Sequence, residues 1–123
     1  MKQVNNDYQK GSQIVVFDQV DSTYVGGVHV DKASALAAFA DGVIPAGTLL
    51  IPHTDGTFKP VNEAYTAVNI VGAIGLTHFD VVIDDFPLAA VVQAGTARVD
   101  ALPARDKAGV AFVKAVLPRI SFY

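Results

Sequence analysis

The side chains that perform most protein chemistry are few in this 123-residue chain, and their spacing matches no common catalytic or metal-binding motif. The chain has no cysteine, which excludes a thiolate nucleophile, a disulfide framework and a cysteine-ligated metal site. The three histidines, His29, His53 and His78, form neither an HExxH motif nor a pair at i, i+4. We therefore expect these imidazoles to lie at the surface or in an interface rather than around a metal.

The three acidic residues Asp80, Asp84 and Asp85 are the other candidates, either as a general acid and base or as calcium ligands. An EF-hand loop is excluded because its alternating acidic positions and terminal glutamate are missing. The run Asp-Asp-Phe-Pro at residues 84–87 is typical of a bend, because aspartate and proline both favour turn geometry. We expect a solvated turn between two strands at this position.

The serine and glycine residues match neither a catalytic nor a phosphate-binding motif. No serine lies in a GxSxG elbow, and the pair Gly72 and Gly75 falls short of the GxGxxG phosphate-binding pattern. We expect these glycines to permit a close backbone approach within a strand. The sequence therefore predicts that the chain is not an enzyme and needs no cofactor.

The composition indicates a protein that associates with other subunits. Hydrophobic residues make up 51% of the chain and charged residues 17%, below the ~25% of an average soluble domain. The longest apolar runs, residues 67–76 and 88–94, are too short for the ~20 residues of a membrane-spanning helix. The net charge of -3 and the lack of a basic cluster argue against nucleic-acid binding. We expect another subunit to cover the excess apolar surface.

The residue pattern in the first third of the chain predicts an arm, short strands and a helix. Residues 1–13 are polar and lack the apolar core of a signal peptide, and they cannot bury enough apolar area to become ordered alone. We expect strands at residues 14–17 and 23–25, separated from the next element by Gly26 and Gly27. Residues 32–40 predict a helix that begins after Asp31, whose carboxylate suits an N-cap, and stops at Gly42.

The remainder predicts a β-rich body and one more helix. Apolar runs between turn residues predict strands at residues 48–51, 68–71, 73–76, 88–93 and 96–99. Asp55 and Gly56 suit a hairpin turn, since glycine tolerates a positive φ. Residues 108–116 predict a helix capped by Asp106, and residues 119–122 a closing edge strand.

The predicted fold class is therefore mainly β with two short helices, a β-rich α+β fold. We expect a small sandwich or barrel-like body with an extended N-terminal arm. Residues 1–23 form the arm and its anchoring strand, and residues 24–123 form a single compact β-rich domain.

From residue 44 onward, an ordered series of short phrases carries a family resemblance: Ile44–Leu50 (IPAGTLL), Asp55–Thr57, Gly72–Leu76 followed by Asp80, Ala89–Val92 with Gly95–Ala97, Leu102–Pro103 and Ile120–Phe122. This order resembles the small head-decoration proteins of tailed bacteriophages, the lambda type, and is similar to the short head-fibre proteins of some phages. Residues 1–42 exceed what a minimal decoration protein contains.

The resemblance implies a structural virion protein on the capsid exterior, assembled in the host cytoplasm. Such proteins are usually homotrimers that bind the major capsid protein, cement neighbouring capsomers and stabilise the shell. The resemblance also implies partner binding by the arm, for which we select Lys2, Val4, Tyr8, Ile14 and Val16. In this hypothesis the arm adds to the shell protein as an extended strand.

The sequence also leaves two other functions open. A head-fibre or appendage module would bind a host-surface glycan, for which clustered exposed aromatic residues would be the sign. A small ligand-binding β-barrel would instead hold a metabolite in a concave apolar pocket.

Overall fold

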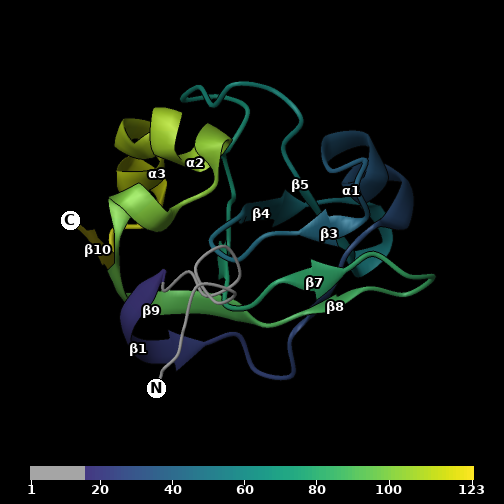
Figure 1. The fold of residues 1–123 in the computed structure, drawn as a ribbon, viewed down its shortest axis with the longest axis horizontal. Coiled ribbons are helices and arrows are strands. Elements are labelled where there is room, and N and C mark those ends of the chain that lie inside the picture. Colours follow the sequence, from purple (N-terminus) through teal and green to yellow (C-terminus); the bar gives the residue numbers. More distant parts are fainter. Residues whose placement is uncertain (1–15) are drawn as a thin grey trace, which may run out of the picture.

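The computed structural model describes residues 16–123, which build an open six-stranded sheet, two small two-stranded sheets and three short helices (Figure 1). The predicted fold class, mainly β with short helices, is confirmed. The six-stranded sheet does not close into a barrel.

The six-stranded sheet is arranged around one central strand, β9 (Val91–Ala97). Along the sheet the strand order is β1 (Phe17–Thr23), β9, β6 (Gly75–Thr77), β4 (Leu49–Pro52) and β5 (Phe58–Pro60), with antiparallel neighbours. The last strand, β10 (Ile120–Phe122), runs parallel to the C-terminal half of β9. Thus β9 pairs with three other strands.

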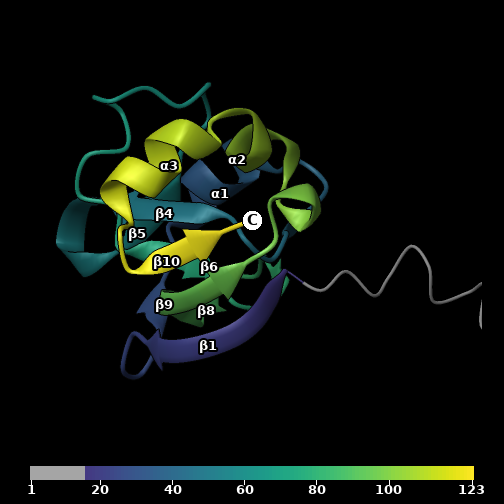
Figure 2. The ribbon, with the colours of Figure 1, turned by 90° about the vertical axis from the view of Figure 1, so that its left-hand side faces the viewer.

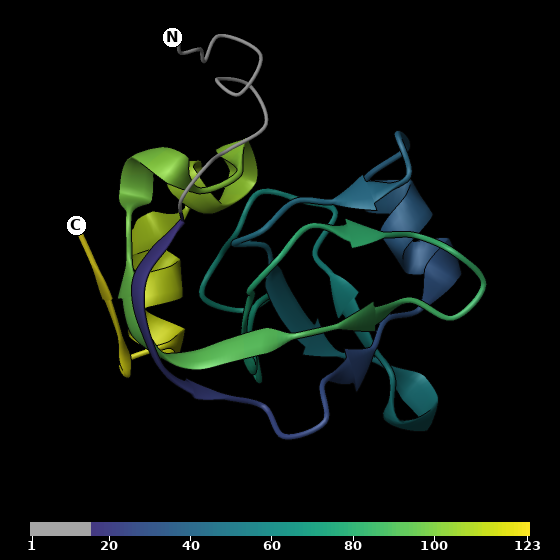
Figure 3. The same cartoon turned by 60° about the horizontal axis from the view of Figure 1, so that its bottom comes forward.

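Two small antiparallel sheets lie at the opposite end of the body from the C-terminal strand (Figures 1 and 3). One pairs β2 (Val28–His29) with β8 (Leu88–Ala89), and the other pairs β3 (Val43–Ile44) with β7 (Val81–Val82). The loop between β7 and β8 therefore joins two different sheets.

Helix α1 (Lys32–Ala38) begins as the sequence predicts. The Asp31 side chain is its N-cap and accepts a 3.0 Å hydrogen bond from the backbone N–H of Ser34. The hydrogen bond from the Ser34 hydroxyl, together with that N–H, lowers the pKa of Asp31. The helix stops at the C-cap Phe39, shorter than the predicted range of 32–40.

The predicted second helix is instead two helices. They are α2 (Ala104–Ala108) and α3 (Val110–Val116), which meet at Gly109. A Cβ at Gly109 would lie 2.9 Å from the Cβ of Tyr65, so the chain needs glycine where the two helices meet. Asp106 lies inside α2 and is buried, so the prediction that it caps a helix is wrong.

Two further predictions on the strands are corrected. Residues 68–71 form turns rather than a strand, and Val68 and Val71 are exposed. Gly95 was predicted to separate two strands, but β9 continues through it. A Cβ on Gly95 would lie 2.2 Å from the carbonyl oxygen of Gln19, so glycine permits a close strand approach here. By contrast, the predicted turn at Asp55 and Gly56 is confirmed, and both residues have a positive φ.

Alternating side chains of the sheet supply two hydrophobic clusters. Leu49 and Val92 belong to the cluster that includes Val113 and Leu117 of the α3 segment. Their chain neighbours Leu50 and Val91 belong to the other cluster, with residues of α1 and of the small sheets. Figure 2 shows α2 and α3 lying over the sheet. Because successive strand residues point to opposite faces, β4 and β9 each contribute to both clusters.

No helix within residues 16–123 is long and apolar enough to cross a membrane.

The close approach at Gly95 predicts a strong effect of one methyl group. Gly95→Ala places a Cβ against the Gln19 backbone, which a side-chain rotation cannot relieve. We expect it to lower the free energy of unfolding by more than about 2 kcal/mol in urea denaturation. Gly42→Ala is the control, because Gly42 also has a positive φ but nothing lies within 4 Å of its added Cβ. Equal losses in the two variants would contradict the role of the close approach.

Candidate interaction surfaces

Of the five predicted arm residues, four lie outside the described residues and one lies within them. Lys2, Val4, Tyr8 and Ile14 lie outside the described residues. Val16 is described and is 4% exposed, and its carbonyl oxygen accepts a 2.7 Å hydrogen bond from the N–H of Arg98. The Val16 side chain is thus part of the core, where it fixes the point at which residues 1–15 join the body.

A polar cluster ties the strand that follows Val16 to its neighbours. Arg98 Nε donates a 2.7 Å hydrogen bond to Asp18, and the Tyr123 hydroxyl donates to the same carboxylate. These hydrogen bonds, that from Tyr123 first, lower the pKa of Asp18. The cluster connects β1 with the ends of β9 and β10. It is exposed, so we expect it to orient the junction rather than to stabilise the fold strongly.

The rings of Phe17, His78 and Phe79 form an aromatic row that begins beside this junction. The rings of Phe17 and His78 meet edge to face at 5.7 Å, and His78 stacks on Phe79 at 3.9 Å. Phe79 is 61% exposed. The row ends at a surface hollow of about 590 Å³ between Gly26, Gly27 and residues 79–90.

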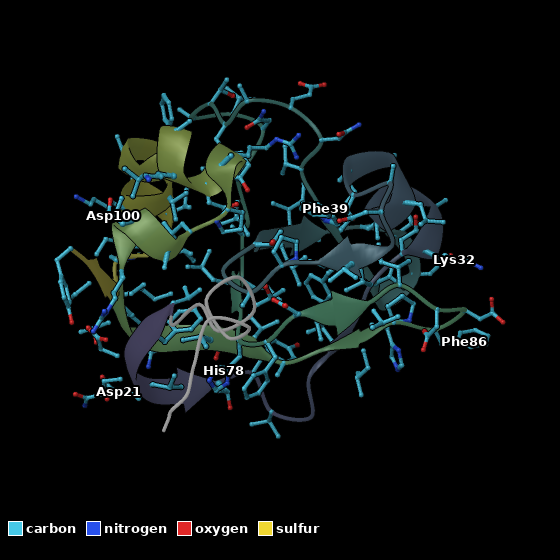
Figure 4. The ribbon with its side chains drawn as sticks, viewed as in Figure 1. Asp21, Lys32, Phe39, His78, Phe86 and Asp100 are labelled. Atoms are coloured by element: carbon cyan, nitrogen blue, oxygen red, sulfur yellow. The ribbon has the colours of Figure 1, made fainter. Side chains whose placement is uncertain are left out.

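The hollow is lined by several exposed apolar side chains. We call the four exposed apolar side chains that line it, Phe79, Val82, Phe86 and Leu88, the apolar surface. Phe86 is 82% exposed and points outward from the end of the body (Figure 4). Large exposed apolar patches on soluble proteins commonly mark interaction sites.

The loop that carries Phe86 is fixed to the body at both ends. The N–H of Ile83 donates to the carbonyl oxygen of Gly42 at 2.8 Å, and the N–H of Val30 donates to that of Pro87 at 2.9 Å. Within the loop, the Phe86 N–H donates to Asp84 at 3.0 Å. The exposed ring is thus held by a structured loop, so little conformational entropy remains to be lost on binding.

A second, smaller hollow of about 350 Å³ lies beside α2 and α3. Its lining includes Tyr65, Ala108, Gly109 and Phe112, and Arg105 lies at the same site. The Nη1 group of Arg105 donates a 2.7 Å hydrogen bond to the carbonyl oxygen of Val61. The guanidinium carries five N–H donors, so others remain for a further acceptor.

Under this second hollow lies the buried carboxyl group of Asp106, which is 1% exposed. It accepts a 3.0 Å hydrogen bond from the N–H of Leu49 on β4, and the Tyr65 hydroxyl bonds to it as well. Burial raises the pKa of Asp106 to about 7, and burial also raises the pKa of Tyr65. The carboxyl group therefore joins α2 to the sheet and to the segment that holds Tyr65.

The residues first considered for chemistry are dispersed and have structural partners. Asp80 accepts the N–H of Ala46 at 2.8 Å, and Asp85 forms a 2.9 Å ion pair with Lys32. His53 lies 3.8 Å from Asp31. Within residues 16–123, no three histidine or acidic side chains are grouped so that they could hold a metal ion.

Sequence reasoning missed both the apolar surface and the tether at Asp106. The apolar surface had a readable signal, since bulky apolar residues flank the Asp-Asp turn in the run Val81–Leu88. Asp106 had none, because a single aspartate near a helix start is normally read as a cap.

No family model matches this sequence, and a search of curated proteins found no match.

The burial of Asp106 predicts a pH dependence. With a pKa of about 7 when folded and 3.8 ordinarily, the group is protonated when folded and ionised when unfolded between these values. Its contribution to stability is complete below pH 4 and is lost as the pH rises through 7. We expect that loss to be about 2–3 kcal/mol between pH 5 and pH 8.

Asp106→Asn isolates this contribution, because the amide oxygen can still accept the Leu49 N–H and cannot ionise. We expect urea denaturation to give a flatter pH profile for the variant than for the parent chain. Histidine titration affects both proteins equally, so the difference between them reports Asp106. Parallel profiles from pH 5 to pH 8 would contradict the prediction.

Proposed function

We propose that the chain is a structural virion protein that binds the outside of a phage capsid as a homotrimer and cements the shell. The observation that carries this proposal is the apolar surface, with Phe86 82% exposed on a loop that is hydrogen-bonded at both ends. A surface of this kind supports a function in protein association. The sequence resemblance supplies the class of partner, the major capsid protein.

The location of the resembling phrases supports the proposal. Residues 44–50 end in β4, residues 72–76 in β6, and residues 89–97 contain β9. In the sheet β9, β6 and β4 are consecutive neighbours. These three phrases therefore lie on neighbouring strands, within a body of the β-rich class that the resemblance implies.

The proposed mechanism divides the chain into an arm and a body. Residues 1–15 precede Val16, whose burial gives the arm a fixed origin. The arm adds to the shell protein as a strand, gaining main-chain hydrogen bonds. The three arms of a trimer then bind neighbouring capsomers, and their modest separate affinities combine because the sites are linked.

Deletion of residues 1–13 tests this division. We expect the truncated chain to keep its circular dichroism spectrum and thermal transition, because the deletion removes none of the core residues found within residues 16–123. We expect its binding to expanded, DNA-free heads of the phage that encodes the chain to fall at least tenfold in a co-sedimentation assay.

Full binding by the truncated chain would contradict the role of the arm. If the full-length chain itself did not sediment with these heads, the proposed function would be wrong.

A further inference from the structure

The loop between β7 and β8, which carries Phe86, and the helices α2 and α3, which line the second hollow, lie at opposite ends of the body (Figures 1 and 3). One end presents a protruding aromatic ring, Phe86, and the other a recess of about 350 Å³ lined by Tyr65, Ala108 and Phe112. A projection and a recess on one chain are the elements of a head-to-tail contact between copies.

The charges at the two ends are opposite. Residues 80–88 carry three aspartates and no basic residue, and Lys32 pairs with one of these aspartates. Residues 104–119 carry four basic residues, Arg105, Lys107, Lys114 and Arg119, and their single acidic residue, Asp106, is buried. Lys107 lies 3.8 Å from the exposed Asp100, which leaves the other three basic residues in excess. Two copies that met through their aspartate-rich ends would repel each other, whereas a head-to-tail contact brings opposite charges together.

The apolar surface is also large enough to matter for association. A fully exposed aromatic side chain presents about 150–250 Å². Scaled by their exposed fractions, the four side chains of the apolar surface together expose about 500 Å². This is more than half of the ~800 Å² that each partner contributes to an interface of standard size. The polar atoms around the two hollows would supply the remainder as a rim.

We infer that copies of this chain associate head to tail, with Phe86 of one copy seated in the hollow of Tyr65, Ala108 and Phe112 on the next. Asp84 then faces the basic surface around Arg105. The inference rests on the self-association in the proposed function, and it names the two faces involved. A contact of this type builds an open chain of copies, or a closed ring where the rotation between successive copies closes.

Sedimentation equilibrium of the full-length chain and its variants tests the inference. Phe86→Ser removes the projection, and Ala108→Trp fills the recess from an exposed position. We expect each variant to dissociate into monomers at a protein concentration at least tenfold higher than the concentration at which the parent chain dissociates. Val68→Ser is the matched control, because Val68 is 80% exposed and lines neither hollow, and we expect it to associate normally.

An equimolar mixture of the two variants gives the most specific result. The Phe86→Ser variant keeps its recess and the Ala108→Trp variant keeps its projection, so one intact contact remains, and we expect a 1:1 dimer that cannot close a ring. This dimer also demonstrates that both variants are folded. A parent chain that stays monomeric, variants that associate like the parent chain, or a mixture that stays monomeric would each overturn the inference.

Asp84→Lys provides a second test that does not depend on filling the recess. We expect it to weaken self-association at low salt, and the difference from the parent chain to shrink in 1 M salt. Head binding is measured separately by co-sedimentation. An oligomer that does not bind heads would refute the proposed function, and an oligomer insensitive to all three substitutions would refute the two faces.

Discussion

The architecture depends on β9, the central strand of the six-stranded sheet, which contributes to both hydrophobic clusters. It pairs with β1, β6 and β10, and alternate side chains such as Val91 and Val92 enter opposite clusters. Such pairing requires unusually close backbone contacts. Glycine occupies position 95 opposite the Gln19 carbonyl and position 75 opposite the Val92 carbonyl, where a Cβ would lie 2.2 and 2.3 Å from these oxygens. The rest of the body is assembled on the two faces of this strand.

The surfaces described above depend on which parts of the sheet the rest of the chain covers. The α2–α3 pair covers one cluster and is tied to β4 through the buried Asp106. At the other end, β7 and β8 belong to separate two-stranded sheets, and no further element within residues 16–123 covers the apolar side chains between them. A single copy therefore leaves Phe86 and its neighbours exposed while holding their backbone in place. Association with protein partners is the function that this arrangement supports best.

Local signals in the sequence were sufficient where one residue type determines the backbone. Asp31 predicted a helix start and Asp55–Gly56 a turn, because an N-cap carboxylate and a positive φ are local requirements. The apolar run at residues 48–51 predicted β4, and the alternation of polar and apolar residues at 119–122 predicted the closing strand β10.

Predictions were wrong where tertiary contacts decided the outcome. Gly95 is typical of a turn until its close approach to Gln19 is known, and the sequence does not show that Tyr65 packs against Gly109, where α2 and α3 meet. The same limit applied to the sites. The two hollows draw on segments that are distant in sequence, such as Gly26 with Phe86 and Tyr65 with Phe112, and pattern reasoning along the chain does not bring them together.

The solution mass of the full-length chain, measured by sedimentation equilibrium over a wide concentration range, tests the central claim most directly. The claim is that other copies cover the apolar end of each body. It predicts a stable species with the mass of three 12.9 kDa chains at micromolar concentration. A single chain mass at every concentration up to the solubility limit would contradict it.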